Sequence, residues 1–211
     1  STEIMTKWTT TEPGQSVNYV ESHDNMTLVD KITASVKDAK PAEIAQLSRL
    51  ASSIPFLAQG MPFMQAGQEF LRSKSGDPNS YKSSDLVNSL KWSTQSANAS
   101  TVKYFKGLIS LRKAHPAFRM ETTDQVKKNL KFLSSPEGTI AYSINGSAVK
   151  DSAATLVVVH NASTSPQSIT LPKSGSWSVL VESGRAGTTV LRKVNGNTIM
   201  VAARSTLVLT Q

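Results

Sequence analysis

The stretch that decides the fold is Val17-Asn18-Tyr19-Val20-Glu21-Ser22-His23-Asp24-Asn25, a short β-prone run that ends in a polar cluster. Residues 26–34 and 41–54 follow it with apolar side chains at helical spacing. A second short apolar run covers residues 62–66, and residues 101–114 show a further helical pattern. Strands that alternate with helices in this way predict βα units with parallel strands.

Two βα units cannot close a parallel barrel, because an eightfold barrel takes about 250 residues. The first part of this chain of 211 residues is therefore predicted to be either the last βα units of a larger (β/α)8 TIM barrel or a small α/β fold.

After residue 118 short β-branched runs are separated by turn residues. The expected strands cover residues 131–133, 139–144, 156–160, 167–171, 177–181, 189–191, 198–201 and 205–210. Ser174-Gly175 and Asn195-Gly196 fall between such runs, and Asn-Gly is a strong hairpin signal. This spacing predicts a C-terminal antiparallel β-sandwich, with residues 1–117 in the α/β part and residues 118–211 in the sandwich.

Composition narrows the class of protein. Hydrophobic residues make up 38% of the chain and charged residues 18%, which favours a globular protein. No run approaches the roughly 20 apolar residues of a membrane span. Cysteine is absent, so disulfides and thiolate metal sites are excluded. The net charge of +8 comes from scattered residues, which favours a solvated basic surface over a nucleic-acid site.

The polar cluster at the end of the first run holds the candidate chemistry. In parallel α/β folds the carboxyl ends of strands face the active site, and His23 and Asp24 stand at such an end. A carboxylate beside an imidazole can stabilise positive charge and bind sugar hydroxyls. The alternative is that Asp24 caps the following helix, because aspartate is an ordinary N-cap. Strand alternation would also let Glu21 point the same way as His23.

Residues 17–25 resemble the fourth signature region of the α-amylase superfamily, glycoside hydrolase family thirteen, in the version of its pullulanase branch. A second stretch, Gln65-Ala66-Gly67-Gln68-Glu69-Phe70-Leu71-Arg72-Ser73-Lys74-Ser75-Gly76-Asp77, followed by Asn79-Ser80-Tyr81, looks like the eighth barrel strand of that branch and its substrate-binding loop. The resemblance is specific over residues 17–92 and architectural after residue 118.

The resemblance implies a retaining glycosidase that hydrolyses α-1,6 linkages in pullulan and related α-glucans, with no cofactor and no metal. Asp24 would stabilise the transition state. The substrate-binding residues would be His23, Asn25, Asp77, Asn79 and Tyr81. Glu69 would have a structural role, such as pairing a buried arginine.

The resemblance also places the nucleophile and general acid on earlier barrel strands, upstream of Ser1. We therefore expect the chain alone to be inactive and its partner to be the N-terminal part of the barrel. The family implies an extracellular or cell-surface bacterial protein. Three alternatives stay open: a carbohydrate-binding or structural sandwich module, another superfamily enzyme such as isoamylase or α-amylase, and a basic nucleic-acid binder.

Overall fold

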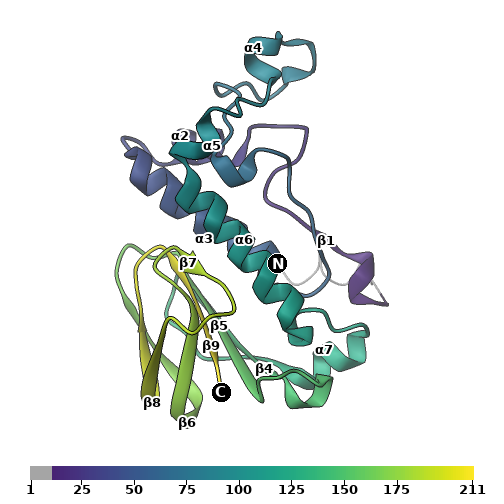
Figure 1. The fold of residues 1–211 in the computed structure, drawn as a ribbon, viewed down its shortest axis with the longest axis vertical. Coiled ribbons are helices and arrows are strands. Elements are labelled where there is room, and N and C mark those ends of the chain that lie inside the picture. The colour runs from purple at the N-terminus through teal and green to yellow at the C-terminus, as the bar shows by residue number, and fades with distance from the viewer. Residues whose placement is uncertain (1–10) are drawn as a thin grey trace.

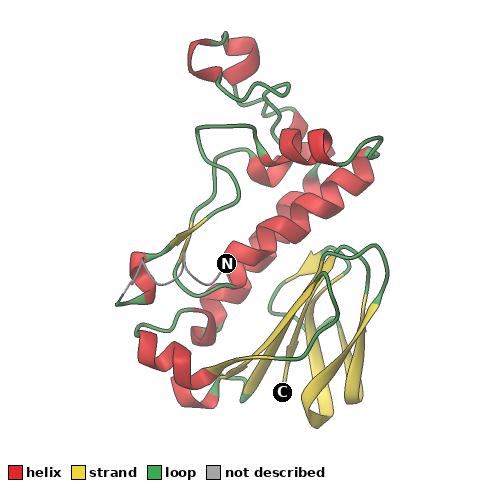
Figure 2. Cartoon of the chain, turned by 180° about the vertical axis from the view of Figure 1, so that it is seen from behind, coloured by secondary structure: helices red, strands yellow, loops and turns green. Residues whose placement is uncertain are grey.

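A computed structural model describes residues 11–211 of the chain (Figure 1). The longer helices are α2 (Leu28–Ser35), α3 (Pro41–Leu57), α6 (Ala99–Ala114) and α7 (Thr123–Asn129). Short helical segments are η1 (Pro13–Gln15), η2 (Gln68–Phe70), η3 (Ser80–Lys82), α4 (Asp85–Asn88), α5 (Thr94–Ala97), η4 (Pro116–Phe118) and η5 (Ser147–Val149). The views from both sides place α4 at the end of the molecule far from the sheet (Figures 1 and 2).

The α/β part is a parallel strand–helix–strand crossover. Strand β1 (Val17–Asn18) pairs with β2 (Met61–Pro62), and α2 and α3 connect them. Parallel pairing of these two runs was predicted, but both strands are shorter than expected, because only two residues of each are hydrogen-bonded to a neighbour. A two-stranded sheet is not a closed barrel, so the described residues contain a βα crossover and not a complete (β/α)8 fold.

Helix α6 fixes the way the chain leaves α3 and enters β2. The buried guanidinium of Arg112 donates hydrogen bonds to the carbonyls of Phe56 (3.0 Å), Ala58 (2.7 Å) and Gly60 (2.6 Å). The last carbonyls of a helix have no partner within the helix. Arg112 satisfies that of Phe56 and also binds two carbonyls that follow α3, those of Ala58 and Gly60. Because Met61 follows at once, Arg112 also sets the start of β2.

The C-terminal part is one antiparallel sheet of seven strands, in the order β3-β4-β5-β9-β6-β7, with β8 paired to β6. Their bounds are Leu130–Phe132 (β3), Thr139–Asn145 (β4), Thr155–Asn161 (β5), Gln167–Glu182 (β6), Arg185–Ala186 (β7), Arg192–Val201 (β8) and Ser205–Thr210 (β9). Strand β6 joins β9 only over its last residues, while its first half pairs with β8 alone. The sheet therefore folds over itself and is sandwich-like.

The predicted turns in the second half are partly wrong. Gly175 and Gly196 do not interrupt their strands but face each other across the β6–β8 pair, where the register shifts. Glycine in a strand often marks a bend or bulge rather than a turn, and that is its role in this ribbon. The runs 167–171 and 177–181 therefore belong to one strand, and residues 189–191 lie outside any strand.

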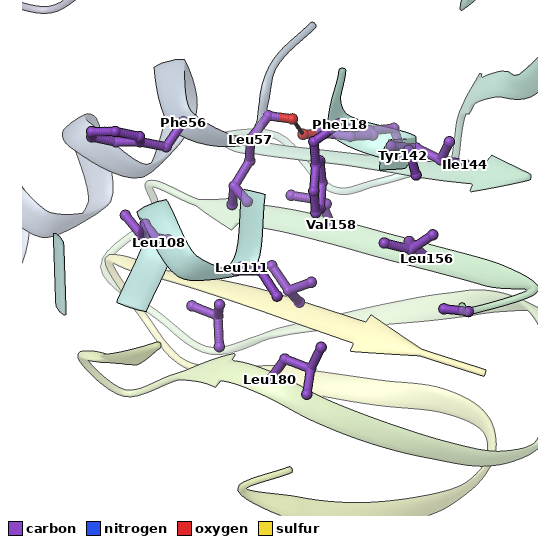
Figure 3. Packing of buried hydrophobic residues seen from close by; sticks show 14 of the residues in the cluster. Phe56, Leu57, Leu108, Leu111, Phe118, Tyr142, Ile144, Leu156, Val158 and Leu180 are labelled. Atoms are coloured by element: carbon purple, nitrogen blue, oxygen red, sulfur yellow. Dashed lines mark hydrogen bonds between the residues drawn. The ribbon is translucent and has the colours of Figure 1, made fainter. Parts of the chain in front are cut away.

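Strand β5 is buried on both faces and separates two cores. Leu156 and Val158 point to the helices, whereas Val157 and Val159 point into the folded sheet. The first core, shown in Figure 3, joins α3, α6 and η4 to the sheet, and in it the Tyr142 hydroxyl donates to a carbonyl at the end of α3. The second core surrounds Trp177, whose side chain is fully buried.

The helices and the sheet thus share a core. The division between residues 117 and 118 stays a prediction.

Candidate functional site

Two polar loops lie side by side at the carboxyl ends of the parallel strands. The first loop, residues 19–27, follows β1, and the second loop, residues 63–84, follows β2. Where the two loops begin, the rings of Tyr19 and Phe63 meet edge to face, with centroids 6.0 Å apart. Parallel strands send their following loops in the same direction. The fold therefore brings together the two stretches that carried the family resemblance.

Helix α2 is capped by residues other than Asp24. The hydroxyl of Thr27, the N-cap residue, accepts a hydrogen bond from the Asp30 amide at 3.2 Å. The carboxylate of Glu21 accepts a second one from the Leu28 amide. Together they satisfy amides of the first turn, which have no partner within the helix. The alternative that Asp24 is the helix cap is therefore wrong.

His23, Asp24 and Asn25 form an exposed tip on the first loop. Within residues 11–211, the Asp24 carboxylate has one hydrogen bond, accepted from the neighbouring Asn25 amide at 3.3 Å. Asn25 adopts a left-handed conformation with φ of 64°. Asparagine tolerates this region better than most residues. The chain thus turns sharply after Asp24 and leaves its carboxylate accessible.

Glu21 is a buried structural carboxyl and does not accompany His23. Its side chain is only 4% exposed, whereas His23 is exposed. Burial raises the pKa of Glu21, while its bond to the Leu28 amide opposes that effect. One of its oxygens, Oε1, is buried without a hydrogen-bond partner in the described chain. The expectation that Glu21 points the same way as His23 is therefore wrong.

A buried network ties the second loop to the first. The Asp30 carboxylate accepts from the Ser73 hydroxyl at 2.5 Å and from the Lys74 amide at 2.7 Å. The Lys74 side chain, in a residue only 5% exposed, then donates to the Ser80 hydroxyl at 2.8 Å and to the His23 carbonyl at 3.3 Å. Sequence reasoning did not assign Asp30 or Lys74 any role, because a polar run does not reveal which of its charges is buried.

The three predicted residues of the second loop differ in their surroundings. Asp77 accepts from the Ser83 hydroxyl at 2.5 Å and from the Asn79 amide at 2.8 Å. These two bonds, the first one above all, hold the pKa of the Asp77 carboxyl below its ordinary value. Asn79 is exposed, and Tyr81 is 74% exposed with the Lys82 ammonium 5.2 Å from its ring centroid. Asp77 therefore shapes the loop, while Asn79 and Tyr81 face solvent.

Glu69 is paired with backbone rather than with an arginine. Its carboxylate accepts from the Gly67 amide at 3.0 Å, where Gly67 has a positive φ of 98°. The suggested arginine pair is not among the ion pairs formed within residues 11–211. The structural role proposed for Glu69 thus takes the form of closing a tight turn after β2.

The two loops offer groups suited to sugar hydroxyls and sugar faces. A carboxylate and an imidazole stand on the first loop, and an amide and an open aromatic ring stand on the second. In the part of the chain that the structure describes, no three His, Asp or Glu side chains gather as a metal site. Over the same residues no helix has the length and apolar character needed to cross a membrane.

Comparisons with known proteins agree with this fold. The family model described as "Pullulanase, all-beta domain" matches residues 126–185. The chain is 40% identical over 171 residues to the pullulanase of Bacillus subtilis (strain 168), an alignment that covers 81% of this chain and 24% of that protein. An isoamylase from Flavobacterium sp. is 27% identical over 209 residues, covering 78% of this chain and 27% of the isoamylase.

Solved structures of pullulanases also superpose closely on this chain. The pullulanase from Bacillus acidopullulyticus superposes with a TM-score of 0.91 at 41% identity, covering 95% of this chain and 25% of that one. The type I pullulanase of B. subtilis, solved with maltose, gives a TM-score of 0.88 at 37% identity and covers 94% of this chain and 28% of that one. The chain spans about a quarter of the length of these relatives. By sequence and by fold, this chain therefore belongs with the pullulanases and corresponds to the C-terminal part of those proteins.

Proposed function

We propose that this chain supplies the sugar-binding side of the active site of a starch-debranching glycoside hydrolase, which cleaves α-1,6 linkages in pullulan and related α-glucans with retention. Asp24 stabilises the charged transition state. His23, Asn25, Asn79 and Tyr81 bind the glucan, and Asp77, expected from the resemblance to bind it too, holds the loop that carries Asn79 and Tyr81. The location expected for the whole protein, outside a bacterial cell or on its surface, rests on the family resemblance alone.

The observation that carries the proposal is the meeting of the first and second loops at the carboxyl ends of β1 and β2. Active sites of parallel barrel folds form at this end of the strands. The capping of α2 by Thr27 and Glu21 leaves the Asp24 carboxylate accessible. Pullulanases with similar chains have been solved with maltose, maltotriose and maltotetraose, which supports an α-glucan as the ligand.

Calorimetric titration of the chain with maltotetraose tests the binding role. Removal of the Tyr81 ring should weaken binding about tenfold, because covering roughly 50 Å² of apolar ring and sugar surface contributes on the order of 1 kcal/mol. Phe132 is the matched control, since its ring is 75% exposed on the sandwich, against 74% for Tyr81. Equal losses for Tyr81→Ala and Phe132→Ala would contradict the loop site. Loss in Phe132→Ala alone would favour the sandwich as a carbohydrate-binding module.

Release of reducing sugar from pullulan tests whether this chain can cleave the glucan without the nucleophile and the general acid. A retaining glycosidase needs a nucleophile and a general acid about 5 Å apart. The resemblance assigns both to barrel strands upstream of Ser1, so the pure 211-residue chain should show no turnover. Turnover that disappears in Asp24→Asn would overturn the proposal that this chain holds only one side of the site.

A further inference from the structure

Lys74 is a buried cation that joins three segments of the chain. Its own amide is held by Asp30, near the start of α2, and its ammonium group contacts Ser80 on the second loop and the carbonyl of His23 on the first. A lysine only 5% exposed is unusual, because burial of an ammonium group is costly unless hydrogen bonds and opposite charges compensate it.

Two buried carboxyl groups lie in the same region as Lys74, and neither forms an ion pair with its ammonium group within residues 11–211. Asp30 is 7% exposed and binds the backbone amide of Lys74, and Glu21 is 4% exposed and close enough for the lysine charge to act on its carboxyl group. These partners are buried in the same region as the ammonium group. The network is therefore a built feature of the fold and not a surface lysine that happens to lie over a carbonyl.

We infer that Lys74 is a positioning residue, which holds the loop bearing His23 and Asp24 in register with the loop bearing Asn79 and Tyr81. The inference rests on the proposed function of those four residues. Lys74 acts through the His23 carbonyl, so it orients the backbone one residue before Asp24. Through Ser80 it fixes the residue between Asn79 and Tyr81. One ammonium group thus contacts the immediate neighbour of Asp24 on one loop and of Tyr81 on the other.

Sugar binding should depend strongly on the distance between the tips of the two loops. A sugar that contacts both loops needs their tips at one fixed separation, and misplacement of binding groups by about 1 Å is enough to weaken binding or catalysis strongly. The two loops come from strands whose pairing covers only two residues each, so the strands alone constrain their tips weakly. Within residues 11–211, the bond from Lys74 to the His23 carbonyl is the side-chain hydrogen bond that joins the first loop directly to the second, and Asp30 anchors the second loop to α2.

The test compares Lys74→Met, which keeps the length of the side chain and removes its charge, with Lys37→Met, at an exposed lysine just after α2. Hydrogen exchange is followed by mass spectrometry on the full 211-residue chain without sugar. Exchange at residues 25–30 and 74–79, where amides next to the network are hydrogen-bonded, should become about tenfold faster or more in Lys74→Met, as expected for loss of hydrogen bonds from a charged group, and should not change in Lys37→Met. Exchange in strands β5 and β9 should stay as in the wild type.

Maltotetraose binding is measured on the same proteins, and Lys74→Met should weaken it about tenfold. Unchanged exchange in both loop segments, or acceleration spread evenly over the sheet as well, would overturn the positioning role. If Lys74→Met does not fold, Ser80→Ala removes one of the two bonds of the Lys74 ammonium group and should accelerate exchange at residues 74–79. A wild-type chain that binds no sugar would count against the proposed function, and the exchange data would still decide the role of Lys74.

Discussion

Acidification should weaken the junction between α3 and the sheet through His160. The imidazole Nδ1 of His160 lies 3.0 Å from the Thr206 hydroxyl and 3.3 Å from the Ser53 hydroxyl. Burial lowers the pKa of His160 from 6.5 to about 4. The nearby phenols, Tyr104 and Tyr142, both have their pKa raised by burial and stay protonated. His160 is thus the group at this junction whose protonation differs between the folded and the unfolded chain in mildly acidic solution.

The direction follows from proton binding in the two states. Above pH 6.5 His160 is neutral in both, and it adds no pH dependence. Between pH 6.5 and 4 the unfolded chain binds a proton at His160 that the folded chain does not, so the free energy of unfolding falls as the pH falls. The difference between a pKa of 6.5 and one of about 4 corresponds to about 3 kcal/mol. This is an upper figure, because a groove between α2, α3 and β4 also reaches the residue.

Urea unfolding of the wild type and of His160→Gln, measured from pH 7.5 to pH 4, checks this. The glutamine keeps a polar side chain and removes the titration. Because His23 and His115 are present in both proteins, the difference between the two curves isolates His160. The wild type should lose up to about 3 kcal/mol more than the variant over this range. A difference that does not vary with pH would refute the reasoning.

Three further substitutions test the packing. Gly107→Ala should cost about 3 kcal/mol in urea unfolding, because the new Cβ would lie 2.1 Å from the Ala186 carbonyl oxygen; an unchanged midpoint would show that α6 can shift. Arg112→Lys should cost about 2 kcal/mol by thermal unfolding, because a single ammonium group cannot reach three separate carbonyls; full stability would mean that the cap of α3 is dispensable. Glu182→Gln, which removes an exposed pair with Arg192, should change stability by less than about 1 kcal/mol, and a larger loss in urea would contradict its surface character.

The sequence predicts elements well where one physical signal dominates. Helices α3 and α6 follow from apolar residues at helical spacing, and β4, β5 and β9 follow from β-branched runs. Prediction from the sequence fails where a glycine can mark either a turn between strands or a bend within one strand. Gly196 was predicted in a hairpin but lies within β8, opposite Gly175, and only the pairing partner distinguishes a turn from a bend. The actual turn at Ser183-Gly184, with φ of 49° and 76°, was not predicted.

The candidate site shows the same limit. The positions of His23 and Asp24 after a strand could be predicted, because strand and helix patterns place them there. The identity of the helix cap could not, since Asp24, Thr27 and Glu21 are all suitable acceptors and only the path of the chain selects between them. The role of Lys74 depends on contacts with Asp30 and His23, which lie 44 and 51 positions earlier in the chain. The sequence around Lys74 does not indicate contacts over such distances.

The burial of β5 on both faces has a consequence for how the strand finds its place. In most strands of antiparallel sheets, slippage by one residue would expose apolar side chains to water, and that penalty fixes the register. In β5 the residues from Leu156 to Val159 are apolar on both faces, so slippage would merely exchange one hydrophobic surface for another. The polar end of the strand must then select the alignment. His160 needs hydroxyl partners on the face of β5 that meets the helices. Asn161 needs the carbonyls of Ser165, Val201 and Ala202 on the opposite face. Only one alignment of β5 satisfies both of these adjacent residues.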